Sequence, residues 1–134
     1  MKKIILSVLF LVTSIALFSC GKMAYERNLD GSWVVSKYTE NGTDKTADFK
    51  TALPNYTISF SKSSHTFTEI ATVLFFTIAV NGNYSFESGK SQLKLTNTSP
   101  NSDVRYFNVV KIKSRSLELE ETGNVAKHYY LIPK

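Results

Sequence analysis

The distribution of apolar and polar positions divides the chain into a short apolar run and a long alternating part. Two lysines precede the run, which covers residues 4–18 and contains only three hydroxyl residues. Its 15 residues are fewer than the about 20 that a helix needs to cross the hydrocarbon core of a bilayer. A basic start followed by a short apolar run is typical of a secretory signal. We therefore predict an export signal over residues 1–19.

Beyond residue 55 the apolar positions recur at every second residue, which is the period of a half-buried β-strand. In the segment 56–61, for example, Tyr56, Ile58 and Phe60 alternate with hydroxyl residues. Clusters of Asn, Gly and Ser separate such segments, and Asn81-Gly82-Asn83 is the strongest hairpin signal among them. The pattern predicts about eight short strands joined by tight turns. The turns are expected at 41–42, 61–64, 81–83, 88–90, 97–103, 114–115 and 123–124.

Three segments depart from simple alternation. Residues 43–53 contain the one plausible helix, because two apolar residues share a face and a proline follows. Val73–Phe76 is apolar on both faces, which predicts a strand that is covered on both sides or faces a partner. In 105–113 the apolar phase shifts by one residue, and a β-bulge near Val109-Val110 reconciles the two halves.

The alternation also assigns side chains to the two faces of the sheet. In the first strand, 33–38, Trp33 and Val35 share one face and Tyr38 lies on the other. In the segment 116–121 the leucines point inward, and the glutamates between them face solvent. The leucines predicted to point inward are Leu93, Leu95, Leu117 and Leu119.

Composition and size favour a closed sheet. The chain has nine Phe, seven Tyr and one Trp, and aromatic residues are enriched in strands. So many strands in a domain of about 100 residues favour a barrel, because closure removes exposed strand edges. We expect an all-β fold, an antiparallel up-and-down meander of about eight strands in one small barrel, with one short helix after the first strand.

The residues after the apolar run indicate the type of signal. Leu17-Phe18-Ser19-Cys20 resembles a lipobox, with an aliphatic residue at −3, a small residue at −1 and the cysteine at +1, although Phe18 is bulkier than the usual occupant. The resemblance implies cleavage between Ser19 and Cys20 and lipidation of Cys20, whose two or three acyl chains would form a stable anchor. Cys20 is the only cysteine of the chain, so no internal disulfide is expected.

This organisation defines three parts and a location. We predict a signal peptide over 1–19, a lipidated tether over 20–28 and one domain over 29–134. Gly21 is not the aspartate that favours inner-membrane retention, so we expect attachment to the bacterial outer membrane, facing the periplasm or the outside. Loss of the two signal lysines lowers the formal net charge from +5 to +3, and no basic stripe indicates a nucleic-acid partner.

The start of the first strand carries a family resemblance. Gly31-Ser32-Trp33, a short helix and a meander of hairpins resemble the lipocalin family, and more narrowly the small lipocalin-like domains of bacterial lipoproteins. The resemblance covers residues 29–134. It implies that Gly31 and Trp33 close one end of the barrel, with Trp33 either stacked under the late cation Arg115 or packed as a large core aromatic. The chain lacks the Thr-Asp-Tyr motif of larger lipocalins, so the resemblance implies the fold and not the ligand class.

The sequence contains no pattern typical of a metal site or a catalytic centre. His65 and His128 lie in separate predicted strands and lack further ligands at metal-binding spacing. There is no Gly-x-Ser-x-Gly elbow and no Gly-rich phosphate loop. Glu118 and Glu120 alternate with leucines and face solvent, which does not suit paired-carboxylate catalysis across a cleft. We therefore expect a non-enzymatic protein without metal or cofactor.

Two functions remain open from the sequence. A barrel mouth offers a pocket for one small hydrophobic ligand, although the same residues equally suit a solid core. The alternative is an envelope protein-interaction module, such as an inhibitor or an accessory subunit of an outer-membrane complex, because an exposed apolar Val73–Phe76 patch would require a partner. The candidate pocket residues are Tyr56, Phe60, Phe67, Phe76, Tyr84 and Phe86.

Overall fold

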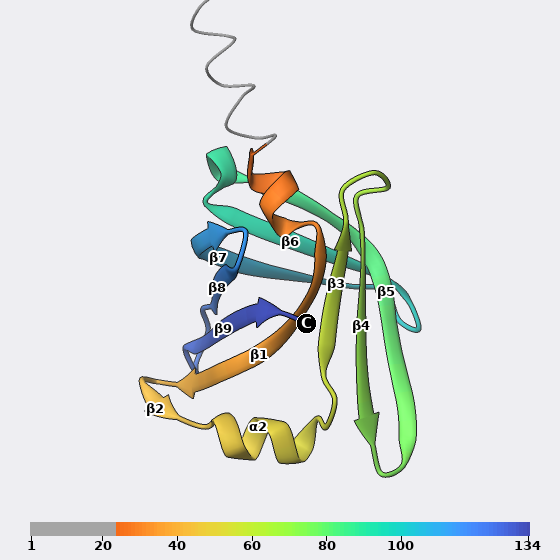
Figure 1. Ribbon diagram of the computed structural model, residues 1–134, viewed down its shortest axis with the longest axis vertical. Coiled ribbons are helices and arrows are strands. Elements are labelled where there is room, and N and C mark those ends of the chain that lie inside the picture. The colour runs from red at the N-terminus through yellow and green to blue at the C-terminus, as the bar shows by residue number, and fades with distance from the viewer. Residues whose placement is uncertain (1–23) are drawn as a thin grey trace, which may run out of the picture.

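The computed structural model describes residues 24–134, which form a closed antiparallel β-barrel (Figure 1). Eight strands follow one another around the barrel in chain order, and β1 closes it by pairing with β9. A short additional strand, β2, pairs with the end of β1. The predicted up-and-down meander is confirmed. The strands are β1 (Gly31–Glu40), β2 (Thr43–Asp44), β3 (Thr57–Ser61), β4 (Thr66–Val73), β5 (Phe76–Glu87), β6 (Gln92–Ser99), β7 (Asp103–Lys113), β8 (Ser116–Glu121) and β9 (Lys127–Pro133).

Short helical segments lie at both ends of the barrel. Residues 24–29 are helical at one end, and α2 (Thr46–Ala52) lies across the other end (Figure 1). The short helix predicted after the first strand is therefore present. It is shorter than the predicted range 43–53, because Thr43–Asp44 pairs with the end of β1 instead.

The N-terminal helical segment, residues 24–29, packs against the barrel. Leu29 is fully buried, and the Trp33 Nε1–H donates a hydrogen bond of 2.9 Å to its carbonyl oxygen. The Tyr25 ring packs edge-on against Phe86, with 5.9 Å between the ring centroids. The packed structure thus already includes residue 24, ahead of the boundary at 29 that the sequence predicted. Residues 20–23 of the predicted tether lie outside the described part of the chain.

A β-bulge in β1 changes which side chains face the interior. Val35 pairs with Leu131 and Lys37 with Tyr130, so Ser36 is an extra residue in β1. The insertion restarts the alternation, and Tyr38 is buried with Trp33 and Val35. The prediction that Tyr38 lies on the opposite face from Trp33 is therefore wrong, because a strict period of two ignores the bulge.

The β-bulge predicted in 105–113 is confirmed. On β7 and β8, Val109 pairs with Leu119 and Lys111 with Glu118, which leaves Val110 unpaired and exposed. The shift of the apolar phase along the sequence was the signal for it. The four leucines predicted to point inward are buried as expected: Leu93, Leu95, Leu117 and Leu119.

The β4–β5 hairpin turns at a different place from the one predicted. The turn residues are Leu74 and Phe75, and Asn81-Gly82-Asn83 lies within β5. Gly82 is needed there for packing, because a Cβ atom at this position would lie 2.1 Å from the Thr96 carbonyl oxygen of β6. The prediction of a hairpin at 81–83 is wrong, since this glycine serves close approach of two strands and not a turn.

The turn of this hairpin combines backbone strain with apolar exposure. Leu74 and Phe75 have φ angles of 47° and 73°, a region that bulky residues rarely adopt. Their exposed fractions are 81% and 99%, and that of the adjacent Phe76 is 74%. The segment 73–76, predicted as a strand that is covered on both sides or faces a partner, therefore includes an exposed hairpin tip, which we define as residues 74–76.

Replacement of the two turn residues by Leu74→Asn with Phe75→Gly is expected to stabilise the barrel by about 1 kcal/mol. Asn-Gly suits a two-residue turn in which both φ angles are positive. The measurement is the free energy of unfolding by urea denaturation. An unchanged or lower stability would show that the wild-type turn is not strained.

Candidate ligand-binding pocket

The interior of the barrel is packed in one half and hollow in the other. Toward the N-terminal helical segment, Leu29, Trp33, Phe60 and Tyr84 belong to the buried cluster, and the rings of Phe60 and Tyr84 meet edge-on with centroids 5.4 Å apart. Toward α2, the barrel contains a cavity of about 260 Å³. The sequence left open whether the interior is a solid core or a pocket. In the structure, one half of the interior is a solid core and the other half contains a pocket.

The wall of the cavity is mainly aliphatic and aromatic. Alternation along the strands places several of these side chains inward, for example Glu69 and Ala71 on β4. The lining residues are Phe49, Leu53, Tyr56, Ile58, Glu69, Ile70, Ala71, Val73, Ile78, Val80, Leu95, Arg105, Phe107, Leu119, Tyr129 and Leu131.

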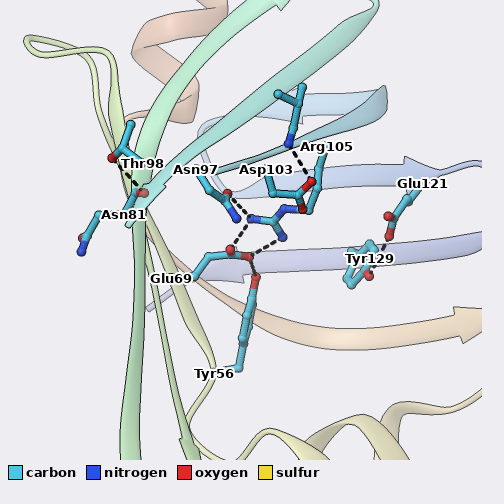
Figure 2. A network of polar contacts seen from close by, with 10 residues as sticks. Tyr56, Glu69, Asn81, Asn97, Thr98, Asp103, Arg105, Glu121 and Tyr129 are labelled. Carbon is cyan, nitrogen blue, oxygen red and sulfur yellow. Dashed lines mark hydrogen bonds and ion pairs between the residues drawn. The ribbon is translucent and has the colours of Figure 1, made fainter. Parts of the chain in front are cut away.

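A polar network built on Glu69 interrupts this apolar wall (Figure 2). Glu69 is 9% exposed. The Tyr56 hydroxyl donates a hydrogen bond of 2.5 Å to Glu69 Oε1, and Arg105 Nη1 donates one of 3.2 Å to the same oxygen. Arg105 Nη2 donates to Glu69 Oε2 and, over 3.3 Å, to Asn97 Oδ1. A bidentate ion pair therefore joins β4 to β7 across the interior, and the Tyr56 hydroxyl donates a further hydrogen bond to its carboxylate.

The environment fixes the charge of this network. Burial raises the pKa of Tyr56 well above its ordinary value, and the neighbouring Glu69 raises it further. Burial by itself lowers the pKa of Arg105, but the hydrogen bonds and the negative charge of Glu69 outweigh it, so that the pKa of Arg105 is raised. At neutral pH Tyr56 is therefore an uncharged donor and Arg105 a cation paired with Glu69.

A cluster of aromatic rings fixes α2 across the cavity end of the barrel. The Phe49 ring of α2 lies 4.9 Å from the Tyr38 ring, 5.4 Å from Tyr56 and 6.2 Å from Tyr129, measured between centroids. The Tyr129 hydroxyl donates a hydrogen bond of 3.4 Å to Glu121. Burial is the main cause of a raised pKa of Tyr129. The helix therefore covers this end through one apolar side chain set among three tyrosines.

The raised pKa values of two buried tyrosines predict that the protein loses stability in alkaline solution. Burial is the main cause that raises the pKa of Tyr38 from 10.0 to about 12, and burial raises that of Tyr84 to about 12. The unfolded chain then releases these protons from about pH 10, before the folded protein does, so the free energy of unfolding falls as pH rises from 10 to 12. Urea denaturation at pH 9 and pH 11 measures the fall. Tyr38→Phe should reduce this fall in the free energy of unfolding, whereas Tyr106→Phe, at an exposed site, should not. An equal fall in the wild type and both variants would contradict the prediction.

Of the six candidate pocket residues, one lines the cavity, four pack in the solid half and one lies outside the interior. Tyr56 lines the cavity and joins its polar network. Phe76 lies at the exposed hairpin tip, because the chain turns at Leu74 and Phe75. The other four pack in the solid half: Phe60, Phe67, Tyr84 and Phe86.

Trp33 is a core residue in this structure. It is 2% exposed, and Gly31 before it pairs with Phe60 at the start of β1. Arg115 is exposed, and within residues 24–134 no cation–π contact joins it to Trp33. The predicted Trp33–Arg115 stack is therefore wrong, and the alternative of a large core aromatic holds. The arginine that stacks inside the barrel is Arg105, which lies over two phenylalanine rings at 5.9 Å from each centroid.

The sequence analysis missed Glu69 and Arg105, although the pattern contained a signal. On β4, Glu69 stands between Phe67 and Ala71 at the inward period of two, and on β7 Arg105 precedes the inward Phe107 by two residues. A charged residue at an inward position needs a partner of opposite charge. Two such residues on separate strands of one barrel would have predicted a buried ion pair.

Some predicted features lie outside the described residues, and others can be checked only within them. Ser19 and Cys20, the predicted cleavage and lipidation site, lie outside the described residues. Within 24–134 no group of three or more His, Cys, Asp and Glu residues is placed to hold a metal ion. His65 instead faces Glu26 at 3.4 Å, and His128 stacks on Tyr130. No helix in this part of the chain has the length and apolar character to cross a membrane.

Comparison with known proteins supports the fold. No protein-family model matches the chain, and no curated protein sequence matches it. Among solved structures it is similar to a lipocalin-like protein from Bacteroides uniformis, with a TM-score of 0.63 and 17% sequence identity, over 80% of this chain and 99% of that one. At this identity the likeness concerns the fold. Together with the closed eight-stranded meander and its short helix, it identifies the described part of the chain as a lipocalin-like β-barrel.

Proposed function

We propose that this barrel is a non-enzymatic binding domain that holds one small, mainly apolar ligand in its cavity. The observation that carries the proposal is an apolar cavity of about 260 Å³ with a single polar network in its wall. An engineered cavity of about 150 Å³ binds benzene, so this volume accommodates a ligand on the order of ten non-hydrogen atoms. Ligand sites commonly combine an apolar wall with a few fixed polar groups.

Filling the cavity tests this proposal with a matched pair of variants. Ala71 is buried and lines the cavity, whereas Ala79, which pairs with Ile70 on the adjacent strand, is exposed on β5. Naphthalene, an apolar probe of suitable size, should bind the wild type and Ala79→Phe with similar affinity in a calorimetric titration. Ala71→Phe should lose at least tenfold in affinity. Absence of naphthalene binding to the wild type, or equal binding by Ala71→Phe, would overturn the proposal.

We also propose that the domain is anchored to the bacterial outer membrane through a lipid on Cys20. The support is the lipobox-like sequence before Cys20. In addition, the helical segment 24–29, which follows Cys20 in the chain, lies at the barrel end opposite α2 (Figure 1), whereas the cavity lies toward α2. Cys20→Ala should yield unprocessed protein without incorporated labelled palmitate. Normal cleavage and membrane attachment of this variant would contradict the anchor.

The hairpin tip supports a second candidate function, docking to an envelope protein. Three consecutive apolar side chains are exposed there on a strained turn, which a protein retains where the segment has a use. In detergent-solubilised envelope, the wild type should migrate in a complex, and Leu74→Asn with Phe75→Gly should migrate as a monomer. Recovery of the wild type as a monomer under the same gentle conditions would argue against this function.

A further inference from the structure

The polar network limits which polar group a ligand can bring into the cavity. Arg105 is the cation in the cavity wall, and the two oxygens of Glu69 already accept hydrogen bonds from both of its Nη atoms. Asn97 accepts a further hydrogen bond from Nη2. The charge of Arg105 is thus neutralised within the protein before any ligand enters.

A charged group near this network, Glu121, is also paired with a residue of opposite charge. Glu121, whose charge acts on Arg105 and Tyr129, lies 3.6 Å from the Lys127 ammonium. Among the described residues that line the cavity, the one cation, Arg105, is paired with Glu69, so none is left unpaired for a ligand carboxylate. A carboxylate entering the cavity would lose its hydration and would also meet the negative charge of Glu69.

The network nevertheless keeps hydrogen-bonding capacity. The Tyr56 hydroxyl uses its proton toward Glu69, so its oxygen remains able to accept. An uncharged acceptor in the wall suits the hydroxyl group of a ligand.

From this arrangement we infer that the cavity selects uncharged apolar ligands that carry a hydroxyl group, and that Glu69 is the residue that excludes carboxylic acids such as fatty acids. The inference rests on the proposed ligand-binding function. It makes Glu69 a specificity-determining residue, because the same pocket without its negative charge would present a free Arg105 to a carboxylate.

Octan-1-ol and octanoate test this selection, because they share a chain length and differ in the charge of one end. Calorimetric titration of the wild type at pH 7.5 should give an affinity for octan-1-ol at least tenfold higher than for octanoate. Equal or tighter binding of octanoate would overturn the inference. This comparison requires no variant and therefore does not depend on how a substitution folds.

The variant Glu69→Gln keeps the side-chain size and one oxygen that can accept from Arg105, removes the negative charge and replaces the second oxygen by an NH₂ group. It should bind octanoate at least tenfold more tightly than the wild type, with little change for octan-1-ol. Glu118→Gln is the control, because this glutamate lies on β8 between inward leucines, near Lys111 and His128. It should leave both affinities unchanged. A gain for octanoate in both variants, or in neither, would contradict the role assigned to Glu69.

Naphthalene separates the failure of this inference from the failure of the proposed function. Because naphthalene has no polar group, it should bind the wild type and Glu69→Gln alike. If naphthalene binds and octanoate binds at least as well as octan-1-ol, the inference on charge is wrong and the pocket stands. If none of the three compounds binds, the ligand-binding function itself is wrong.

Discussion

Replacement of Gly82 by alanine is expected to destabilise the barrel by about 3 kcal/mol. A Cβ atom at this position would lie 2.1 Å from the Thr96 carbonyl oxygen and 2.7 Å from Cε1 of Phe67. The first of these atoms belongs to the backbone of β6, so it moves away only if the β5–β6 pairing shifts. Phe67 is 1% exposed in the core and has little room to move. Both neighbours therefore resist displacement by the new methyl group. The measurement is the free energy of unfolding by urea denaturation.

Gly123→Ala provides the matched control for this substitution. No atom lies within 4 Å of a Cβ built on Gly123, and the residue stands in the exposed turn before β9. The same chemical change should therefore alter stability by less than about 0.5 kcal/mol. Alanine lowers the conformational entropy of the unfolded chain and by itself raises stability, so a loss in Gly82→Ala must arise in the folded barrel. A similar loss in both variants, or a loss below about 1 kcal/mol for Gly82→Ala, would contradict the close strand contact.

Gly82 also shows where sequence reasoning about the fold reaches its limit. The alternation of apolar and polar residues predicts the strands well, because burial of one face is a local property of each strand. It even locates the bulge at Val110, since the phase of the pattern shifts there. Asn81-Gly82-Asn83, however, satisfies the rules of a turn and of a close strand contact equally. Only the position of Thr96 on the neighbouring strand separates the two cases.

The actual turn illustrates the opposite error. Leu74 and Phe75 carry no turn signal, because their side chains disfavour positive φ. The pairing of β4 with β5, from Val73 with Phe76 onward, nevertheless places the turn there. Local preference was overridden by the register of the longer hairpin, so a rule based on residue type fails at this point.

The candidate site was predictable only in part, for a similar reason. Sequence analysis selected aromatic residues for the pocket, and Tyr56 is the one that lines the cavity. Whether an inward aromatic side chain fills space or borders it depends on what stands opposite, and Leu29 and Trp33 fill the half that contains Phe60. Glu69 and Arg105 were the more informative positions, since charge on an inward face is rare.

Loss of the arginine from this pair should produce the second large effect. Arg105→Met is expected to destabilise the protein by about 3 kcal/mol at neutral pH, because it leaves Glu69 buried without its cation. We choose the lower end of the usual range, since the Arg105 side chain is 26% exposed while that of Glu69 is 11% exposed.

The double variant Glu69→Leu with Arg105→Met separates the cost of an unpaired charge from the worth of the pair. Two buried ions lose hydration on folding, and their mutual attraction recovers that loss only in part, so apolar replacements of similar volume should restore stability to within about 1 kcal/mol of the wild type. Thermal and urea unfolding of the wild type, both single variants and the double variant give the coupling energy directly. A double variant as unstable as Arg105→Met would mean that the pair stabilises the barrel through its geometry. Full recovery would instead mean that a stable barrel does not need the Glu69–Arg105 pair, which leaves ligand selection as the role that the cavity gives it.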